Sequence, residues 1–473
     1  MSDNKDKPNL IYIFADQLGY SRCGFTGDKT ARTSNIDNFS KEGVNFTNAV
    51  STMPVCAPYR ASLFTGKYPT TTGMVINELR MNPNQKCFGH ILTESNYNTA
   101  YIGKWHLYAN ELGNHYDSKN SFVPPGPHRL GFDGYWAAYN FNHLYYHGFY
   151  HRNTPRQIRY EKGVYEPDAQ TNLAMEYLEG AAISGKPFAL FLSYGTPHDP
   201  WTRSNVPQEY RKIFKDIGFP NPPNYEPEND KYADPWGRLS NNERKKLEKW
   251  RKYYYAMTAN LDWNFGRLIE QIDKLSLSKN TIVVFTSDHG EMLGSHGRRA
   301  KNIFYEEAIR VPLLFRWPGK IPKNLTSDAC VGTVDIMPTL LSLMGLENPK
   351  DAEGVDLSHC ALGLEGVEPE FAFLQNTGAC ADWINGHEWR GFRDKKYTYA
   401  VFRVDNSEIL FDNIKDPYQK TNLAENSEYS ELIKKCRNKL KIKMYSINDT
   451  FEKCTWYRDN WTKNRIILRG ARD

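Results

Sequence analysis

Several features that mark particular classes of protein are missing from this sequence. It contains no apolar run of the roughly 20 residues needed to span a lipid bilayer, and its polar start, MSDNKDKPNL, has no signal-peptide pattern. Its eight cysteines are scattered, with no C-x-x-C pair and no disulfide-dense spacing, which is typical of a reducing compartment. We therefore expect a cytoplasmic protein that makes no membrane contact.

A strong charge of one sign is missing too. The net charge of +5 over 473 residues is too small to indicate a nucleic-acid partner, although it helps the binding of anionic substrates. We find no internal repeat. With 40% hydrophobic and 24% charged residues, the chain has the composition of a soluble globular protein, and its length predicts one large domain and a smaller one.

Five short, nearly continuous apolar runs predict strands that are buried on both faces, as in parallel sheets. They are residues 9–16, 99–105, 187–194, 281–287 and 311–315. Between the third and fourth runs, apolar residues at steps of three and four predict a long helix with a buried stripe, formed by Tyr254, Met257, Leu261, Phe265, Leu268 and Ile272. Strands that alternate with helices predict an α/β fold, with a large mixed, mostly parallel sheet sandwiched by helices.

A second unit begins near residue 368. It carries short strand-like pieces at residues 396–402 and 408–411 and then a helix at about residues 427–443. We therefore divide the chain into a large domain, residues 1–367, and a smaller C-terminal α+β subdomain, residues 368–473.

Two segments between the third and fourth predicted strands carry no chemistry in this interpretation. Residues 219–236 are rich in proline and predict an irregular surface loop. Residues 243–252 are basic, and we interpret them as a solvated helix face rather than as a binding patch.

Polar residues follow the ends of several predicted strands. They are Asp16, Lys104, His106, His198 and Asp288. In open α/β sheets, ligands bind at the carboxyl ends of the strands. Core packing does not explain polar side chains that recur at these positions, so we expect them to meet in one site.

Residues 54–66, PVCAPYRASLFTG, predict a helix. Pro58 suits its first turn, and Gly66 is a natural stop. Cys56 would then lie at the positive end of the helix with Arg60 one turn behind it, which suits a nucleophile that handles an anion. A lone C-x-P-x-R motif is more often a small buried cysteine beside an ordinary helix start, so the interpretation depends on the rest of the chain.

Together, three motifs resemble those of the formylglycine-dependent sulfatases, a branch of the alkaline-phosphatase-like superfamily. They are CAPYRASLFTG from Cys56, GKWH at residues 103–106 and TPHDP at residues 196–200. Tyr59 stands where the family more often has a small residue, and Asn96 stands where glycine is usual. The resemblance implies that a sulfatase-maturing enzyme oxidises Cys56 to an aldehyde, whose hydrate attacks sulfur. It also implies that the C-terminal subdomain has a small antiparallel sheet and a packed helix.

By the same resemblance, Asp16, Gln17, Asp288 and His289 hold one divalent cation beside the modified Cys56. Oxygen ligands favour Ca²⁺, or else Mg²⁺, and a histidine ligand also admits Mn²⁺. Neighbouring strand residues face opposite ways, so the chain must turn for Gln17 to join Asp16. Without the resemblance, Asp16-Gln17 and Asp288-His289 could each equally well be a turn.

The resemblance assigns further roles around the cysteine. Lys104 and Lys301 would grip the sulfate oxygens, and Arg60 would fix the hydrate. His106 would take a proton from the hydrate when sulfate is expelled, and His198 would protonate the leaving alcohol or phenol; both roles suit the pKa of histidine. The alternatives are a surface lysine at residue 301 and histidines that only pack.

The expected activity is the hydrolysis of a small sulfate monoester. Residues 133–150, DGYWAAYNFNHLYYHGFY, form either a pocket wall or a packed aromatic loop; as a wall they favour a sulfated sugar slightly over an aryl or steroid sulfate. Two rival interpretations stay open. One is a phosphonate or phosphodiester hydrolase of the same superfamily, and the other is an inactive protein that binds sulfated glycans and never has Cys56 oxidised.

Overall fold

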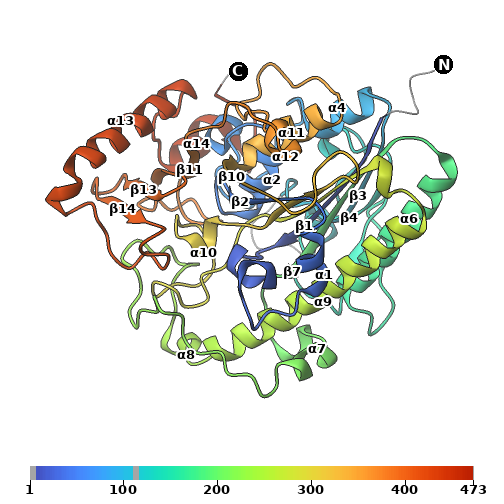
Figure 1. The fold of residues 1–473 in the computed structure, drawn as a ribbon, viewed down its shortest axis with the longest axis horizontal. Coiled ribbons are helices and arrows are strands. Elements are labelled where there is room, and N and C mark those ends of the chain that lie inside the picture. Colours follow the sequence, from blue (N-terminus) through green and yellow to red (C-terminus); the bar gives the residue numbers. More distant parts are fainter. Residues whose placement is uncertain (1–6, 110–116, 472–473) are drawn as a thin grey trace.

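The computed structural model describes residues 7–109 and 117–471. Its centre is an eight-stranded sheet in the order β10-β2-β9-β8-β1-β7-β3-β4 (Figure 1). The strands are β10 (Leu325–Gly332), β2 (Val44–Val50), β9 (Leu313–Arg316), β8 (Thr281–Ser287), β1 (Asn9–Asp16), β7 (Phe188–Pro197), β3 (Asn98–Lys104) and β4 (Tyr135–Tyr139). The pairings of β9 with β2 and β8 are antiparallel and the others are parallel, which confirms the predicted mixed, mostly parallel sheet.

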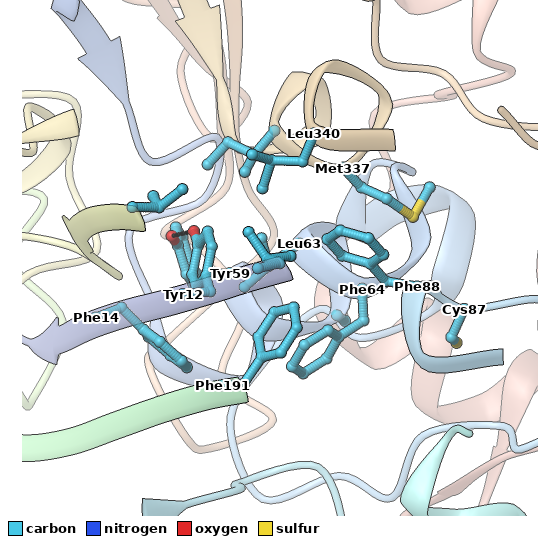
Figure 2. Close-up of a cluster of buried hydrophobic side chains, with 14 of the residues drawn as sticks. Tyr12, Phe14, Tyr59, Leu63, Phe64, Cys87, Phe88, Phe191, Met337 and Leu340 are labelled. Carbon is cyan, nitrogen blue, oxygen red and sulfur yellow. Dashed lines mark hydrogen bonds between the residues drawn. The ribbon is translucent and has the colours of Figure 1, made fainter. Parts of the chain in front are cut away.

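Both faces of the sheet are buried, which explains the continuous apolar runs of its strands. On β1, Tyr12 and Phe14 belong to the core on one face, whereas Ile11 and Ile13 belong to the core on the other. The first core is covered by α2 (Cys56–Thr65), α4 (Phe88–Glu94) and α11 (Thr333–Leu343). Figure 2 shows side chains of these helices packed around Tyr12 and Phe191 of the sheet.

The second face is covered by α1 (Ser34–Phe39), α6 (Glu166–Ser184) and α9 (Leu247–Lys274), with α9 running across the whole layer in Figure 1. The six residues of the predicted stripe lie on α9 and are fully buried. This confirms the helical sandwich. Within the described ranges, no helix is both long and apolar enough to cross a bilayer.

The C-terminal part contains a four-stranded antiparallel sheet of β11 (Ala372–Asn376), β12 (Trp389–Arg393), β13 (Tyr397–Phe402) and β14 (Glu408–Asp412). Helix α13 (Ser430–Ser446) packs on it through Ile433 and Leu440. The sheet and helix confirm the expected architecture, while the boundary at residue 368 stays a prediction. After α14 (Cys454–Trp461), the tail returns to the large domain, where the Ile467 amide donates to the Arg80 carbonyl at 2.9 Å.

The remaining elements are short. The helices are α3 (Pro69–Thr72), α5 (Ser118–Ser121), α7 (Gln208–Ile213), α8 (Asn241–Arg244), α10 (Glu306–Ile309) and α12 (Ser358–Leu362). The strands are β5 (Phe149–Tyr150), β6 (Ile158–Arg159), β15 (Thr462–Lys463) and β16 (Ile466–Ile467). Single 3-10 turns occupy Tyr20–Arg22, Gly24–Thr26, Pro127–Arg129, Arg203–Asn205, Ser278–Asn280 and Ser427–Tyr429.

A buried ion pair holds the segment after α13 against the small sheet. Arg390 on β12 and Asp449 are both 0% exposed, and two hydrogen bonds of 2.5 and 2.9 Å join them. We expect Asp449→Ala to lower the free energy of unfolding by about 3–5 kcal/mol, because it leaves a buried guanidinium without its partner. Urea unfolding followed by tryptophan fluorescence measures this. The matched change at an exposed pair, Glu431→Ala beside Lys434, should cost under about 1 kcal/mol, and equal losses would contradict the prediction.

Candidate active site

The carboxyl ends of four neighbouring strands bring the predicted polar residues together. Asp16 ends β1, Lys104 ends β3, His198 follows β7, and Asp288 and His289 follow β8. These strands are adjacent in the order β8-β1-β7-β3. The side chains are buried, and they meet around the N-terminus of α2 as the parallel topology predicts.

Four side chains form a compact group of potential metal ligands. One ligand atom from each of Asp16, Cys56, Asp288 and His289 lies within 4.8 Å of the others. The Cys56 Sγ is 3.2 Å from His289 Nε2 and 3.6 Å from Asp16 Oδ1. Two carboxylates and an imidazole suit a divalent cation such as Ca²⁺, Mg²⁺ or Mn²⁺.

The protonation state of His289 also suits the binding of a cation. The His289 Nδ1 is 3.0 Å from the Gly290 carbonyl, so its N–H donates there and the lone pair of Nε2 faces the cluster. Burial lowers the pKa of His289 to about 4, which keeps the imidazole in the neutral form that binds metals.

The two carboxylates repel each other in this buried position. Burial and the negative charge of Asp16 raise the pKa of Asp288 above its ordinary value. Burial also acts to raise the pKa of Asp16, but the charges of Lys104 and Lys301 outweigh it and lower that pKa. A cation between the carboxylates would remove their repulsion, so the residues fit the expected metal.

Gln17 lies where the chain turns out of β1. Its φ of 75° is in the left-handed region, and its amide N–H donates to Asp288 Oδ1 at 2.9 Å, so the turn that a shared site requires is present. The side-chain oxygen accepts from Lys301 Nζ at 2.7 Å. Its role as a metal ligand stays a prediction.

Cys56 is the first residue of α2, and Gly66 ends the helix with a φ of 65°. Arg60, one turn along, is fully buried and donates to the Lys104 carbonyl at 2.5 Å and to Ser193 Oγ at 2.8 Å. Those two bonds come from Nη1, and Nη2 of the same guanidinium is 3.4 Å from Asp288 Oδ2. Arg60 therefore ties the helix to the end of β3, to β7 and to the residue that follows β8, and it supports the charge of Asp288.

Two lysine–histidine pairs stand next to the ligand group. Lys301 Nζ is 2.7 Å from His198 Nε2, and Lys104 Nζ bonds to Asp16 and lies 3.2 Å from His143 Nε2. The rings of His143 and His198 are 3.9 Å apart. Burial, together with the charges of Lys301 and Lys104, lowers the pKa of His198 well below its ordinary value. The arrangement supplies fixed positive charge beside a histidine.

His106 contacts Glu78, a residue that lines the cavity above Cys56. Its Nε2 is 3.2 Å from Glu78 Oε1, and its ring is 5.0 Å from that of Phe141. Burial raises the pKa of Glu78 to about 7. Glu78 and Phe141 both line the cavity above Cys56, so the structure places His106 behind that wall.

An active-site cavity of about 250 Å³ opens over Cys56. Its lining comes from residues 56, 77–78, 141, 143, 198–199, 236, 299–301 and 380–382. Phe141 and His143 come from the aromatic segment, whereas Tyr139 and Tyr145 are buried in the interior, so that segment is both a pocket wall and a packed loop.

Sequence reasoning missed part of this lining. Glu78, Trp236 and residues 380–382 carry no recognisable motif, and residues 380–382 come from the predicted second unit. His143, by contrast, lies in the segment of residues 133–150, whose aromatics and histidines offered a pocket wall from the sequence. Arg60, Lys104, His198 and Lys301 are brought to the cluster, and their catalytic roles stay predictions.

Comparisons with known proteins identify relatives of this chain. A family model for sulfatases matches residues 8–346, and a model for the C-terminal part of N-sulphoglucosamine sulphohydrolase matches residues 294–445. An ulvan-active sulfatase of Formosa agariphila is 37% identical over 96% of this chain and 84% of its own. An N-acetylglucosamine-6-O-sulfatase of Bacteroides thetaiotaomicron is 27% identical over 95% of this chain and 88% of its own.

Solved structures share the whole fold. A protein in complex with its substrate D-glucosamine-2-N,6-O-disulfate superposes with a TM-score of 0.80 at 25% identity, over 94% of this chain and 99% of that one. A phosphonate monoester hydrolase of Agrobacterium radiobacter superposes with a TM-score of 0.72 over 93% of this chain and 96% of that one; at 21% identity it shows the fold alone. Because the sulfatase model spans most of the chain and a named sulfatase matches nearly all of it, this protein belongs to the sulfatase family, within the type I branch of the alkaline-phosphatase-like superfamily.

Proposed function

We propose that this sulfatase releases sulfate from a sulfated carbohydrate, with a formylglycine made from Cys56 as its nucleophile. The observation that carries the proposal is the composition of the active-site cavity. Cys56, His198 and Lys301 share it with the indole of Trp236, which is 43% exposed and donates to Asp382 at 3.2 Å. An aromatic face beside a hydrogen-bond acceptor suits a sugar ring and its hydroxyls.

Two groups complete the site in this proposal. A divalent cation, Ca²⁺ first and Mg²⁺ or Mn²⁺ as alternatives, would be held by Asp16, Gln17, Asp288, His289 and the modified Cys56, and would supply positive charge for the sulfate oxygens. The aldehyde hydrate would supply one hydroxyl that accepts the sulfuryl group and a second that allows its elimination. A sulfatase-maturing enzyme is the partner that makes it. The cytoplasmic location stays a prediction.

Protein side chains place positive charge near the sulfate, accept a proton and hold residue 56 in position. Lys104 and Lys301 contribute fixed positive charge, which stabilises negative charge that builds on the transferring group. His106 lies behind the cavity wall, so it would take the proton released when sulfate leaves the enzyme by way of Glu78, which lines the cavity and contacts the imidazole. Arg60 keeps α2, and so residue 56, fixed against the strand ends.

His198 would protonate the leaving oxygen. Burial, with the nearby charges of Lys301 and Lys104, lowers the pKa of His198 and keeps its imidazole neutral in the free protein. A bound sulfate ester brings negative charge that offsets Lys104 and Lys301, so the pKa of His198 rises toward its ordinary value and the imidazole can carry the needed proton.

A panel of substrates tests the proposal. We expect the matured protein to hydrolyse at least one sulfated monosaccharide or disaccharide with a kcat/KM at least about tenfold above that for an aryl sulfate. The reason is that the sugar also contacts Trp236 and Asp382 in the lining of the active-site cavity. Ion chromatography of released sulfate measures this. Turnover of aryl and steroid sulfates alone would overturn the carbohydrate assignment.

The same panel decides between the rival functions. An aryl phosphodiester should be a poorer substrate than the aryl sulfate, and a clear preference for it would favour a phosphodiesterase. Mass spectrometry of the peptide that contains Cys56, after expression with a maturation enzyme, tests the binding-protein alternative. A thiol that persists without any sulfate release would support that alternative.

A further inference from the structure

A second hollow lies beside the active-site cavity and is larger, at about 360 Å³. It is lined by parts of residues 199–203, 246–250, 291 and 299–300. Asp199, Arg299 and Ala300 line both spaces. The two spaces therefore adjoin at these residues, on the side of the active-site cavity where Arg299 lies.

The hollow carries an excess of positive charge. Its cations are Arg203, Lys246, Lys249 and Arg299. Arg299 is paired with Glu243, but in the described part of the chain the other three have no carboxylate within 4.0 Å. All three are exposed to solvent. Three unpaired cations around one concave surface favour an anionic ligand.

The two carboxylates in the lining, Asp199 and Glu291, offset only part of the charge of its four cations. Asp199 lies 3.2 Å from His198 Nδ1, on the side of the active site. Glu291 accepts the amide of Ala300 at 2.7 Å through one of its oxygens. Both carboxylates are therefore engaged with the walls of the hollow rather than with its lysines.

The lysines also stand where a cation is unfavourable. Lys246 directly precedes the 28-residue helix α9, and Lys249 lies in its first turn, where Glu248 between them offsets part of their charge. The N-terminus of a helix carries partial positive charge, so like charges placed there repel it. A bound anion would relieve that repulsion at the same point.

Two aromatic side chains, with rings tilted by 53° to each other, form part of the wall of the hollow. The rings of Trp201 and Trp250 are 5.7 Å apart, and the Arg299 guanidinium lies 5.9 Å from the centre of the Trp250 ring. Trp201 is nearly buried and donates to the Pro197 carbonyl at 2.9 Å, which fixes its orientation. Cations beside fixed aromatic rings suit a sugar unit that carries an acidic group.

We propose that this hollow is a second anion subsite, which binds a carboxylate or sulfate on the sugar unit next to the one that carries the scissile sulfate. The inference rests on the proposed carbohydrate sulfatase function and makes its substrate an acidic oligosaccharide. It also changes the interpretation of residues 243–252, of which Lys246 and Lys249 are then part of a binding surface rather than only of a solvated helix face.

Matched disaccharides and matched variants test the subsite. The substrates share one scissile sulfate, and the neighbouring sugar is neutral, carries a carboxylate, carries the same carboxyl group reduced to an alcohol, or carries a second sulfate. We expect an acidic neighbour to raise kcat/KM at least about tenfold in the unmodified protein. The double variant Lys246→Gln/Lys249→Gln should lose most of this gain and keep its kcat/KM for the neutral disaccharide.

A charge-matched control separates local binding from general attraction. Lys245→Gln/Lys252→Gln removes the same charge from neighbouring positions outside the lining of the hollow, and it should keep the gain. Equal losses in the two double variants, or equal kcat/KM for acidic and neutral disaccharides, would overturn the inference. If kcat/KM rises only for the disaccharide with the carboxylate, or only for the one with the second sulfate, the result identifies which group is bound.

Binding measurements keep the two proposals apart. Calorimetric titration of each disaccharide into the inactive Cys56→Ala protein reports on the subsite without any turnover. The acidic disaccharides should bind about tenfold more tightly than the neutral one, and the difference should disappear with the two lysines replaced. Failure to hydrolyse any of the disaccharides, acidic or neutral, would end the carbohydrate function, whereas equal binding of acidic and neutral forms would end only the subsite.

Discussion

Replacement of Cys56 by alanine should abolish sulfate release, with kcat/KM reduced by at least about 10⁴-fold. Alanine cannot be oxidised to an aldehyde, so the variant has no hydroxyl pair to accept and then eliminate the sulfuryl group. The thiol is 1% exposed and stands within the cluster of potential metal ligands, where no other residue of the described chain offers a side chain that can be converted in this way. Sulfate release from the best substrate of the panel measures the effect.

A second thiol in the same cavity is the control. Cys380 also lines the active-site cavity and is 5% exposed, so Cys380→Ala removes a sulfur of similar burial from the same space. We expect Cys380→Ala to keep its activity within about tenfold and Cys56→Ala to keep the thermal unfolding temperature of the unmodified protein within a few degrees. Substantial turnover by Cys56→Ala, or full activity of a protein whose Cys56 is an intact thiol, would remove the nucleophile assignment.

Removal of divalent cations by a chelator should also abolish turnover, and Ca²⁺ should restore it. The reason lies in the two buried carboxylates, Asp16 and Asp288, whose mutual repulsion a cation would neutralise. Isothermal titration of Ca²⁺ into the chelated protein, repeated with Mg²⁺ and Mn²⁺, gives a readout that is independent of activity. Asp288→Asn should weaken Ca²⁺ binding at least about tenfold, because it removes one of the two negative charges.

The pH dependence of this binding has a definite sign. Burial and the charge of Asp16 raise the pKa of Asp288, so this carboxyl keeps its proton at a higher pH than an ordinary aspartate. A cation must displace that proton, and its affinity should therefore be lower at about pH 5 than at about pH 7.5. Full activity of the chelated protein, or a Ca²⁺ affinity that rises as the pH falls, would contradict the metal site.

The main sheet could be predicted from the sequence because its strands are buried on both faces. Residues 9–16 and 281–287 match β1 and β8 because continuous apolar runs between polar ends leave few alternative boundaries. The predicted strand 187–194 was too short, since β7 continues through Gly195, Thr196 and Pro197. Proline cannot donate to a strand partner, so propensity places the end of a strand before it, whereas pairing with Asp16 of β1 extends β7 through that residue.

The strand-end positions of Asp16 and Asp288 could be worked out from the sequence alone, because parallel strands carry whatever follows them to one edge of the sheet, whereas their grouping with Cys56 and His289 was implied by the resemblance to the sulfatases. Only the tertiary structure placed Trp236 and residues 380–382 over Cys56, joined the second hollow to the first through Arg299, and turned Arg60 toward the strand ends. Local sequence patterns report which face of an element is buried. They do not report which distant loops close over that face, because contacts between loops depend on how the finished layers pack.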